Sequence, residues 1–283
     1  NNPNYADDAI RKALDGQDKW ASSISQRSVV VAETAAFHVL YLHAIAQINE
    51  AVSACRGEDT NDEYDLTHPW DEVAALLIGS LEGPSEGGSP DVEDGQLVWS
   101  LANRRAFQFQ TTNSKGYSQV GARLEDLLFA GRGEIDAENC DNLERTGEQI
   151  KSTIMIPLLQ SIIRYAIDNV DAPSSSGSQS LALGEVYALA AIPIIRASDE
   201  NAASVLEENM IVNDGIPLVR DGAQTVASAA GAAAVAVGME CSAVGSTSQV
   251  DACSGNSSDA ATWTRVVPFV TCCMSAVAVL FVL

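Results

Sequence analysis

Long apolar runs dominate the chain and predict helices. Residues 28–55 contain neither glycine nor proline and are apolar over more than half of a helical circumference, which predicts one long, mostly buried helix. A second long apolar helix is predicted over residues 145–170. Residues 69–81 begin with a proline, which favours the first helical position, and are apolar almost all round, so we expect a short internal helix. Further helices are predicted over residues 96–110, 123–131, 181–197 and 199–210 and over an alanine-rich segment that ends near Met239.

The segments between these helices are polar and rich in turn-forming residues. Residues 56–68 and 82–95 are acidic loops, and residues 173–180 form a serine-rich loop. No run alternates apolar and polar residues in the manner of a strand, so the sequence predicts an all-α helical bundle. We expect a first helical half at 1–130, a second at 131–240, a Ser/Gly-rich linker at 241–265 and an apolar tail at 266–283.

A short internal similarity relates the two predicted halves. Four residues near the start of one short helix match four residues of a later helix, namely Glu72, Val73, Ala75 and Leu76 with Glu185, Val186, Ala188 and Leu189. Each copy follows a long apolar helix and a polar loop. The match predicts two repeated helical lobes, and chance similarity between two Ala/Leu-rich helices is the alternative.

The end of the chain has the layout of a lipid-anchor signal. Residues 266–283 are apolar and uncharged, and residues 253–265 supply small residues and a short polar spacer. This order is typical of a glycosylphosphatidylinositol (GPI) signal, in which the tail is removed and lipid is joined to Ser254, Gly255 or Asn256. A retained membrane helix is the alternative, although a segment of this length only just spans a bilayer. Asn256 also begins an acceptor sequence for N-glycosylation.

The beginning of the chain and its cysteines fit an exported protein. The first residue is not Met, so we expect either a removed leader or a fragment. Four cysteines precede the tail, an even number suited to two disulfides. Three pairings are possible; Cys241 and Cys253 bracket a Gly/Ser-rich loop and are expected to pair, which leaves Cys55 with Cys140. No CxxC spacing occurs, so a thiolate metal site is disfavoured.

The charge balance narrows the classes of partner. The chain has 16 Lys and Arg against 38 Asp and Glu, a formal charge of −22. A protein this acidic repels phosphate backbones and anionic lipid, so we expect no nucleic-acid partner. Cations and basic surfaces remain possible partners. The chain also lacks a GxSxG elbow and a lysine-containing phosphate loop, and we expect no enzymatic activity.

Three segments carry a resemblance to a known family. Trp70–Gly83 ("WDEVAALLIGSLEG"), Leu101–Phe109 ("LANRRAFQF") and Gly184–Met210 occur in an order that resembles the algal low-iron-inducible Fe-assimilating proteins, which are related to the phytotransferrins. The resemblance implies a protein of the cell surface or periplasmic space, and the predicted GPI signal adds the expectation that it is held at the outer leaflet of the plasma membrane. It also implies that the protein captures ferric iron for uptake, with carbonate as a synergistic anion.

Several residues have the chemistry that ferric iron prefers. Fe³⁺ is a hard cation that favours carboxylate, phenolate and imidazole ligands. Thr34, His38 and Tyr41 share one face of the predicted long helix, and His43, Gln47 and Glu50 form a second such row. The absence of an HxxxH pair disfavours an ordinary zinc site. The alternative for each row is a set of satisfied core residues or a polar stripe between helices.

Acids near two predicted helix starts complete the candidate ligand set. Asp71 and Glu72 begin one short helix, Glu185 occupies the matching place in the second copy, and Tyr187 follows two residues later. Glu72 and Glu185 are predicted as paired ligands, and the alternative is that acids in a first helical turn interact with free backbone N–H groups.

Two adjacent arginines are candidates for the anion. Arg104 and Arg105 could hold carbonate bidentately, or form salt bridges with surface acids. The alternative function for the whole chain is a GPI-anchored structural or adhesive surface protein without a metal site.

Overall fold

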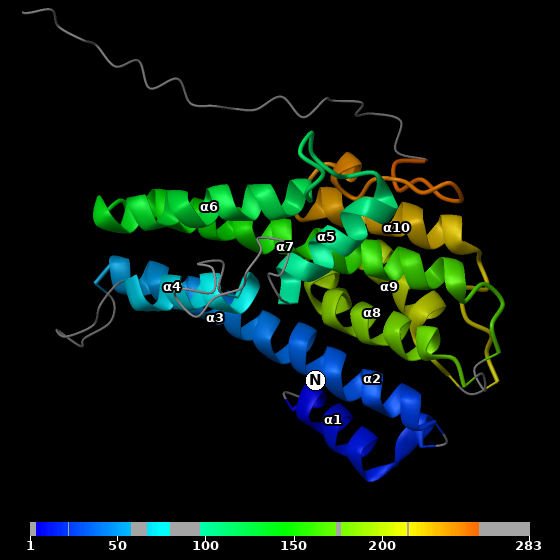
Figure 1. Cartoon of the computed structure of the whole chain (residues 1–283). Helices are drawn as coiled ribbons and strands as arrows, with labels where there is room; N and C mark the ends of the chain where they lie inside the picture. The colour runs from blue at the N-terminus through cyan, green and yellow to red at the C-terminus, as the bar shows by residue number, and fades with distance from the viewer. Residues whose placement is uncertain are drawn as a thin grey trace, which may run out of the picture.

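The protein is all-α, as the sequence predicts (Figure 1). The computed structural model describes residues 4–254 apart from residues 22, 58–66, 80–96, 174–176 and 214. Within these ranges there is no strand, and only two isolated bridges occur, Thr112 with Ser118 and Ser246 with Asp251. The helices are α1 (Tyr5–Asp15), α2 (Ile24–Thr34), α3 (Tyr41–Cys55), α4 (Thr67–Leu77), α5 (Leu97–Phe109), α6 (Gln119–Asp136), α7 (Cys140–Asp168), α8 (Gln179–Ser198), α9 (Glu200–Met210) and α10 (Ala223–Ala236).

The predicted long helix exists, with one irregularity. The helix α2 is capped by Ser23, whose hydroxyl accepts a hydrogen bond from the Gln26 backbone N–H. It continues through a π-helical segment, η2 (Ala35–Leu40), directly into α3. Burial is lower than predicted: a third of its most apolar 18-residue stretch (33 %) is buried, and Val39 and Leu42 are exposed, because this helix lies at one side of the bundle (Figure 1).

Among the residues that the structure describes, two helical runs match a membrane span in length and hydropathy. They are Ile24–Cys55 and Gln179–Ser198. The second is largely a core helix, since 61 % of its most apolar stretch is buried against other helices. Core helices of water-soluble proteins have the same length and composition, so this match by itself assigns no location.

The helix α7 forms the centre of the molecule. It packs against α3, α5, α6, α8 and α10, and residues 153–163 are buried without interruption. Asn139 caps its start by accepting a hydrogen bond from the Asn142 backbone N–H. A stretch that is buried on every face must be surrounded by other helices, and this explains why α7 is the central one.

The helix α4 packs on α6 through a tryptophan and a glycine. The Trp70 side chain is 1 % exposed, and its Nε1 donates a hydrogen bond to the Leu128 carbonyl at 2.9 Å. A Cβ on Gly131 would lie 1.9 Å from the Trp70 ring, so the ring occupies the space that a side chain would fill. The prediction that this helix is internal was wrong in part. Only one face is buried, because Asp71 and Ala75 face solvent.

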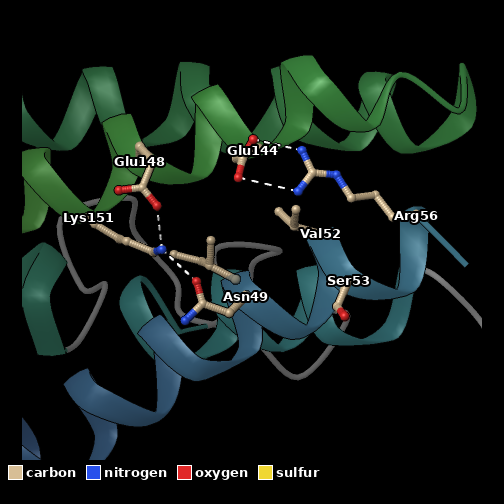
Figure 2. Close-up of a pocket in the computed structure, with 8 residues that line it drawn as sticks. Asn49, Val52, Ser53, Arg56, Glu144, Glu148 and Lys151 are labelled. Atoms are coloured by element: carbon tan, nitrogen blue, oxygen red, sulfur yellow. Dashed lines mark hydrogen bonds and ion pairs between the residues drawn. The ribbon is translucent and has the colours of Figure 1, made fainter. Parts of the chain in front are cut away.

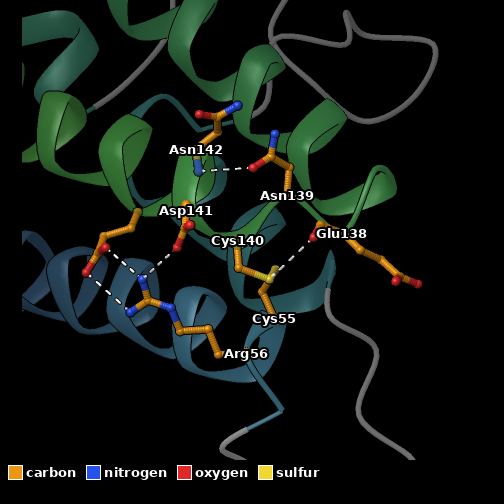
Figure 3. The surroundings of a disulfide bond; sticks show 8 residues. Cys55, Arg56, Glu138, Asn139, Cys140, Asp141 and Asn142 are labelled. Atoms are coloured by element: carbon orange, nitrogen blue, oxygen red, sulfur yellow. Dashed lines mark hydrogen bonds and ion pairs between the residues drawn. A yellow bond between two sulfur atoms is a disulfide. The ribbon is translucent and has the colours of Figure 1, made fainter.

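Both predicted disulfides are present. Cys55 at the end of α3 joins Cys140 at the start of α7, with their Cα atoms 5.6 Å apart (Figure 3). Cys241 joins Cys253. Beside the first disulfide, Arg56 pairs with Glu144 at 2.7 Å and with Asp141 at 3.4 Å. The first disulfide therefore links the end of the side helix α3 to the start of the central helix α7.

The first part of the predicted linker, residues 241–254, is folded against the bundle. The described part of this segment, 241–254, is tied to the bundle by its disulfide and by the Gln160 side chain, whose Nε2 donates to the Val244 carbonyl at 3.0 Å. Val244 and Ala252 are buried. Gly231 lets this segment pack closely against α10, since a Cβ at position 231 would lie 2.0 Å from the Ala252 carbonyl oxygen.

The predicted halves share one core. A single hydrophobic cluster contains buried residues from both sides of residue 130, and that position falls inside α6. The two matched helices, α4 and α8, differ in environment: the Glu72 side chain is 35 % exposed and the Glu185 side chain is 5 % exposed. The internal repeat stays a prediction.

Candidate functional site

Two buried polar groups without partners lie in and directly after the π-helical segment. His38 lies within η2 and Tyr41 follows directly after it, and they are 2 % and 1 % exposed. Neither His38 Nδ1 nor the Tyr41 hydroxyl has a hydrogen-bond partner in the described part of the chain. Unpaired buried polar groups are costly, and π-helical turns are frequent at functional sites. This pair is therefore the strongest site candidate in the structure.

The hydrogen bonds of His38 define its protonation. Its Nε2 lies 2.8 Å from the Val186 carbonyl in α8, and since a carbonyl only accepts, Nε2 carries the proton. The lone pair on Nδ1 is then free. Metal-ligating histidines have this arrangement, with the second ring nitrogen donating to a carbonyl or carboxylate. Burial lowers the pKa of His38, the Val186 contact opposing the shift, and burial raises the pKa of Tyr41 far above its usual value.

Tyr5 of α1 covers this histidine. The ring centroids of Tyr5 and His38 are 5.4 Å apart and the rings are tilted by 49°. Tyr5 is partly buried, and burial raises its pKa. No motif in the sequence connects the first helix with the long helix, so sequence reasoning missed this residue.

The buried histidine makes stability depend on pH. Its folded-state pKa lies below the unfolded value of about 6.5, so at lower pH the unfolded chain binds the extra proton. We expect the stability that the neutral His38 ring contributes to be present in full above about pH 6.5 and to be lost as the pH falls below that value. Urea unfolding at a series of pH values measures the slope. The His38→Gln variant should flatten it, whereas His68→Gln, at an exposed position of α4, should leave it unchanged; an equal slope in all three proteins would contradict the expectation.

Glu185 belongs to a different cluster. Its Oε1 pairs with Lys19 Nζ at 2.5 Å and its Oε2 accepts from the Val212 backbone N–H at 2.8 Å. Lys19 also donates to the Val212 carbonyl at 3.0 Å. Both carboxylate oxygens are thus engaged, and the cluster joins the N-terminal segment to α8 and to the turn after α9.

Tyr187 is likewise committed to a protein partner. Its hydroxyl donates to Glu33 Oε2 at 2.7 Å, and its ring lies against Phe37 at 5.2 Å and stacks on Tyr165 at 5.8 Å. Burial, followed by the charge and hydrogen bond of Glu33, raises the pKa of Tyr187. Glu33 is a second residue that sequence reasoning missed.

The two candidate arginines differ in exposure. Arg104 faces solvent, whereas Arg105 is 6 % exposed. Arg105 Nε donates to Ser161 Oγ at 2.8 Å, its Nη1 donates to Gln108 Oε1 at 2.7 Å, and its guanidinium lies 5.1 Å from the centroid of the Tyr165 ring.

Asp71 and Glu72 lie at the surface near the start of α4. Asp71 pairs with Arg132 of α6 at 2.8 Å, and Glu72 contacts His43 of α3 at 3.0 Å. Glu72 and Glu185 therefore have different partners. The second predicted row is not buried either, because His43 is exposed and Gln47 and Glu50 are partly exposed. The helix α4 begins at Thr67, so neither acid lies in its first turn, and both contact neighbouring helices instead of free backbone N–H groups.

A surface pocket lies between α3 and α7 (Figure 2). It measures about 240 Å³, and Arg56, Glu144, Glu148 and Lys151 contribute charged groups to its lining. The cations and acids pair with one another: Lys151 Nζ contacts Glu148 and Asn49, each at 2.6 Å. The pocket is therefore balanced in charge and contains none of the predicted site residues.

The predicted ligands do not form one cluster. Among the described residues, no group of three or more His, Cys, Asp and Glu side chains comes together in a way that could hold a metal ion. Of the predicted lipid-attachment residues, Ser254 ends the described part of the chain, and Gly255 and Asn256 lie outside it, as does the apolar tail at 266–283.

Comparison with protein-family models, with curated proteins and with solved structures finds no match to this chain.

Proposed function

We propose that this chain is an exported, disulfide-bonded helical protein of the cell surface that binds ferric iron for uptake, with carbonate as a co-bound anion. Its two disulfides support an oxidising compartment. The pattern of residues 253–283 supports anchoring by lipid at Ser254, Gly255 or Asn256. Iron uptake at the outer face of the plasma membrane is consistent with both features.

One observation carries the iron proposal: His38 Nδ1, in the π-helical segment η2, and the hydroxyl of Tyr41, the first residue of α3, are buried and have no hydrogen-bond partner in the described part of the chain. Imidazole and phenolate are ligand types that ferric iron accepts. The Tyr41 pKa is raised by burial, so the hydroxyl is protonated in the free protein. Iron binding would then release this proton and become tighter with rising pH.

The ligand set becomes smaller than the sequence suggested. Glu185, Tyr187, Asp71 and Glu72 all have protein partners, so the proposal depends on His38 and Tyr41. Carbonate and water would complete the shell, as the hard ferric ion requires oxygen donors.

A structural or adhesive surface protein is the second candidate. The dispersal of the predicted acidic ligands, together with the absence of a His/Cys/Asp/Glu cluster in the described ranges, favours it. In this candidate, His38 and Tyr41 serve only the packing of the long helix.

A ferric titration of the purified chain separates the two candidates. If iron binds, we expect saturable binding that is tighter with bicarbonate, and a visible phenolate-to-iron absorption band. Tyr41→Phe should remove the band, and His38→Gln should weaken binding by about tenfold or more, because each variant deletes one ligand atom.

Matched variants distinguish ligand loss from damage to the fold. Tyr117→Phe and His43→Gln change the same residue types outside the buried pair and should bind iron as the unchanged chain does. Iron binding that is equal in Tyr41→Phe, His38→Gln and the unchanged chain would reject this site and favour the structural candidate.

A further inference from the structure

The pocket between α3 and α7 has walls that the fold holds in place. The Cys55–Cys140 disulfide joins the two helices covalently. They also approach each other closely at Ile48, because a Cβ on Gly147 would lie 2.6 Å from the Ile48 Cγ2 atom. A recess with walls fixed in this way binds a small molecule without the entropic cost of ordering those walls.

The two walls supply different chemistry. The helix α7 contributes Glu144, Glu148 and Lys151, whose spacing of four and three residues places them on one helix face. The helix α3 contributes the apolar side chains of Ile48 and Val52, which are 1 % and 8 % exposed. An apolar surface beside a few convergent polar groups is typical of small-molecule sites.

The charges that line the pocket form two ion pairs. Arg56 pairs with Glu144 at 2.7 Å and Lys151 pairs with Glu148 at 2.6 Å, and Figure 2 shows these pairs at opposite ends of the pocket with Val52 between them. The glutamate side chains are 49 % and 64 % exposed. Ion pairs this exposed contribute little to stability, so a ligand can share their charges without harm to the fold.

These pairs leave hydrogen-bonding capacity for a ligand. The Lys151 ammonium has three N–H donors, and in the described part of the chain two of them are accepted, by Asn49 Oδ1 and Glu148 Oε1. Glu144 and Glu148 are four residues apart on α7, a spacing at which like charges repel, so a cation between them relieves the repulsion. The pocket can therefore receive a cationic group at the two glutamates and an anionic group at Lys151.

We propose that this pocket binds a small zwitterion with an apolar body, the chemistry of a free amino acid with an aliphatic side chain. The ligand's ammonium group lies between Glu144 and Glu148, its carboxylate accepts from Lys151, and its side chain packs on Val52. The four charged lining residues sum to zero, and a zwitterion preserves that balance. The volume of about 240 Å³ is below the roughly 300–1,000 Å³ of pockets that hold drug-sized ligands. This proposal is independent of iron binding, since neither His38 nor Tyr41 lines the pocket.

The site is tested by titrating L-leucine into the purified, disulfide-intact chain at constant ionic strength, while NMR follows the methyl groups of Ile48 and Val52. We expect saturable shifts of these signals with a dissociation constant of about 1 mM or lower. Two analogues each lack one charged group: 4-methylpentanoate has no ammonium and 3-methylbutylamine has no carboxylate. Each analogue should bind at least about tenfold more weakly than leucine, because it loses one charged hydrogen-bonding contact.

Two exposed glutamates provide a matched pair of variants. Glu148→Gln removes one carboxylate from the pocket, so the affinity for leucine should fall at least about tenfold, while binding of 4-methylpentanoate should not weaken. Glu208→Gln changes a glutamate of α9 that is 60 % exposed and pairs with Arg220, and it should bind leucine as the unchanged chain does. Thermal unfolding of each variant checks that the fold is intact.

Three results would overturn the proposal. They are the absence of saturable methyl shifts with leucine in the unchanged chain, binding of either analogue as tight as that of leucine, and unchanged leucine affinity in Glu148→Gln. Equally tight binding of the amine would identify a site for cations alone. Since no iron is present, any of these results leaves the ferric titration to be judged separately.

Discussion

Replacing Trp70 by alanine is expected to lower the free energy of unfolding by about 3–5 kcal/mol. The indole is almost fully buried between α4 and α6, donates a hydrogen bond to the Leu128 carbonyl, and fills the space above Gly131. Its loss leaves a cavity at the contact that holds α4 on the bundle. Urea or thermal unfolding of the disulfide-intact protein measures the effect.

The opposing glycine provides the internal control. Gly131→Ala alone should cost about 1–3 kcal/mol, because the new methyl group would collide with the Trp70 ring. In the Trp70→Ala background the collision is gone, so the double variant should cost less than the sum of the two. Phe107→Ala, at an 84 % exposed aromatic of α5, should change stability little. Simple additivity of the first two changes would show that the indole and the glycine are not in contact.

Removing the Cys55–Cys140 disulfide by a double serine replacement is expected to cost about 4–5 kcal/mol. The two cysteines are 85 residues apart in sequence, and a cross-link that closes a long loop removes much conformational freedom from the unfolded chain. Unfolding of the variant and the parent in the same non-reducing buffer measures the difference.

The second disulfide serves as the comparison for this experiment. Cys241 and Cys253 are 12 residues apart, so their replacement by serine should cost less, about 3 kcal/mol. A larger loss from the short-loop pair than from the long-loop pair would contradict the loop-length explanation and would indicate that packing of 241–254 against α7 dominates.

The helices could be predicted because their signals are local. Apolar runs bounded by glycine, proline and polar residues gave the positions of α7, α8 and α9 closely, and the even cysteine count with the short Cys241–Cys253 loop led to the correct pairing. The π-helical turn was not predictable, because η2 differs from its flanks in hydrogen bonding and not in composition. Burial of α4 was overestimated since alanine is tolerated on an exposed helix face.

The candidate site was predicted only where one helix carries it. His38 and Tyr41 were recognised from their spacing along the long helix, whereas the Lys19 contact of Glu185 joins distant parts of the sequence. Arg104 and Arg105 were predicted alike from the sequence. Val98, Leu101 and Phe109 are buried on one face of α5, and helical periodicity places residue 105, but not residue 104, on that face. That periodicity was the signal that could have separated them.

The position of the long-loop disulfide also affects how the chain responds to cleavage. Cys55 and Cys140 enclose all residues from 56 to 139, including the two acidic segments around residues 60 and 90. A protease that cuts a single peptide bond anywhere in this interval produces two fragments that remain covalently joined, with α3 still attached to the start of α7. Backbone nicking in these segments would therefore separate the two pieces only after the disulfide is reduced.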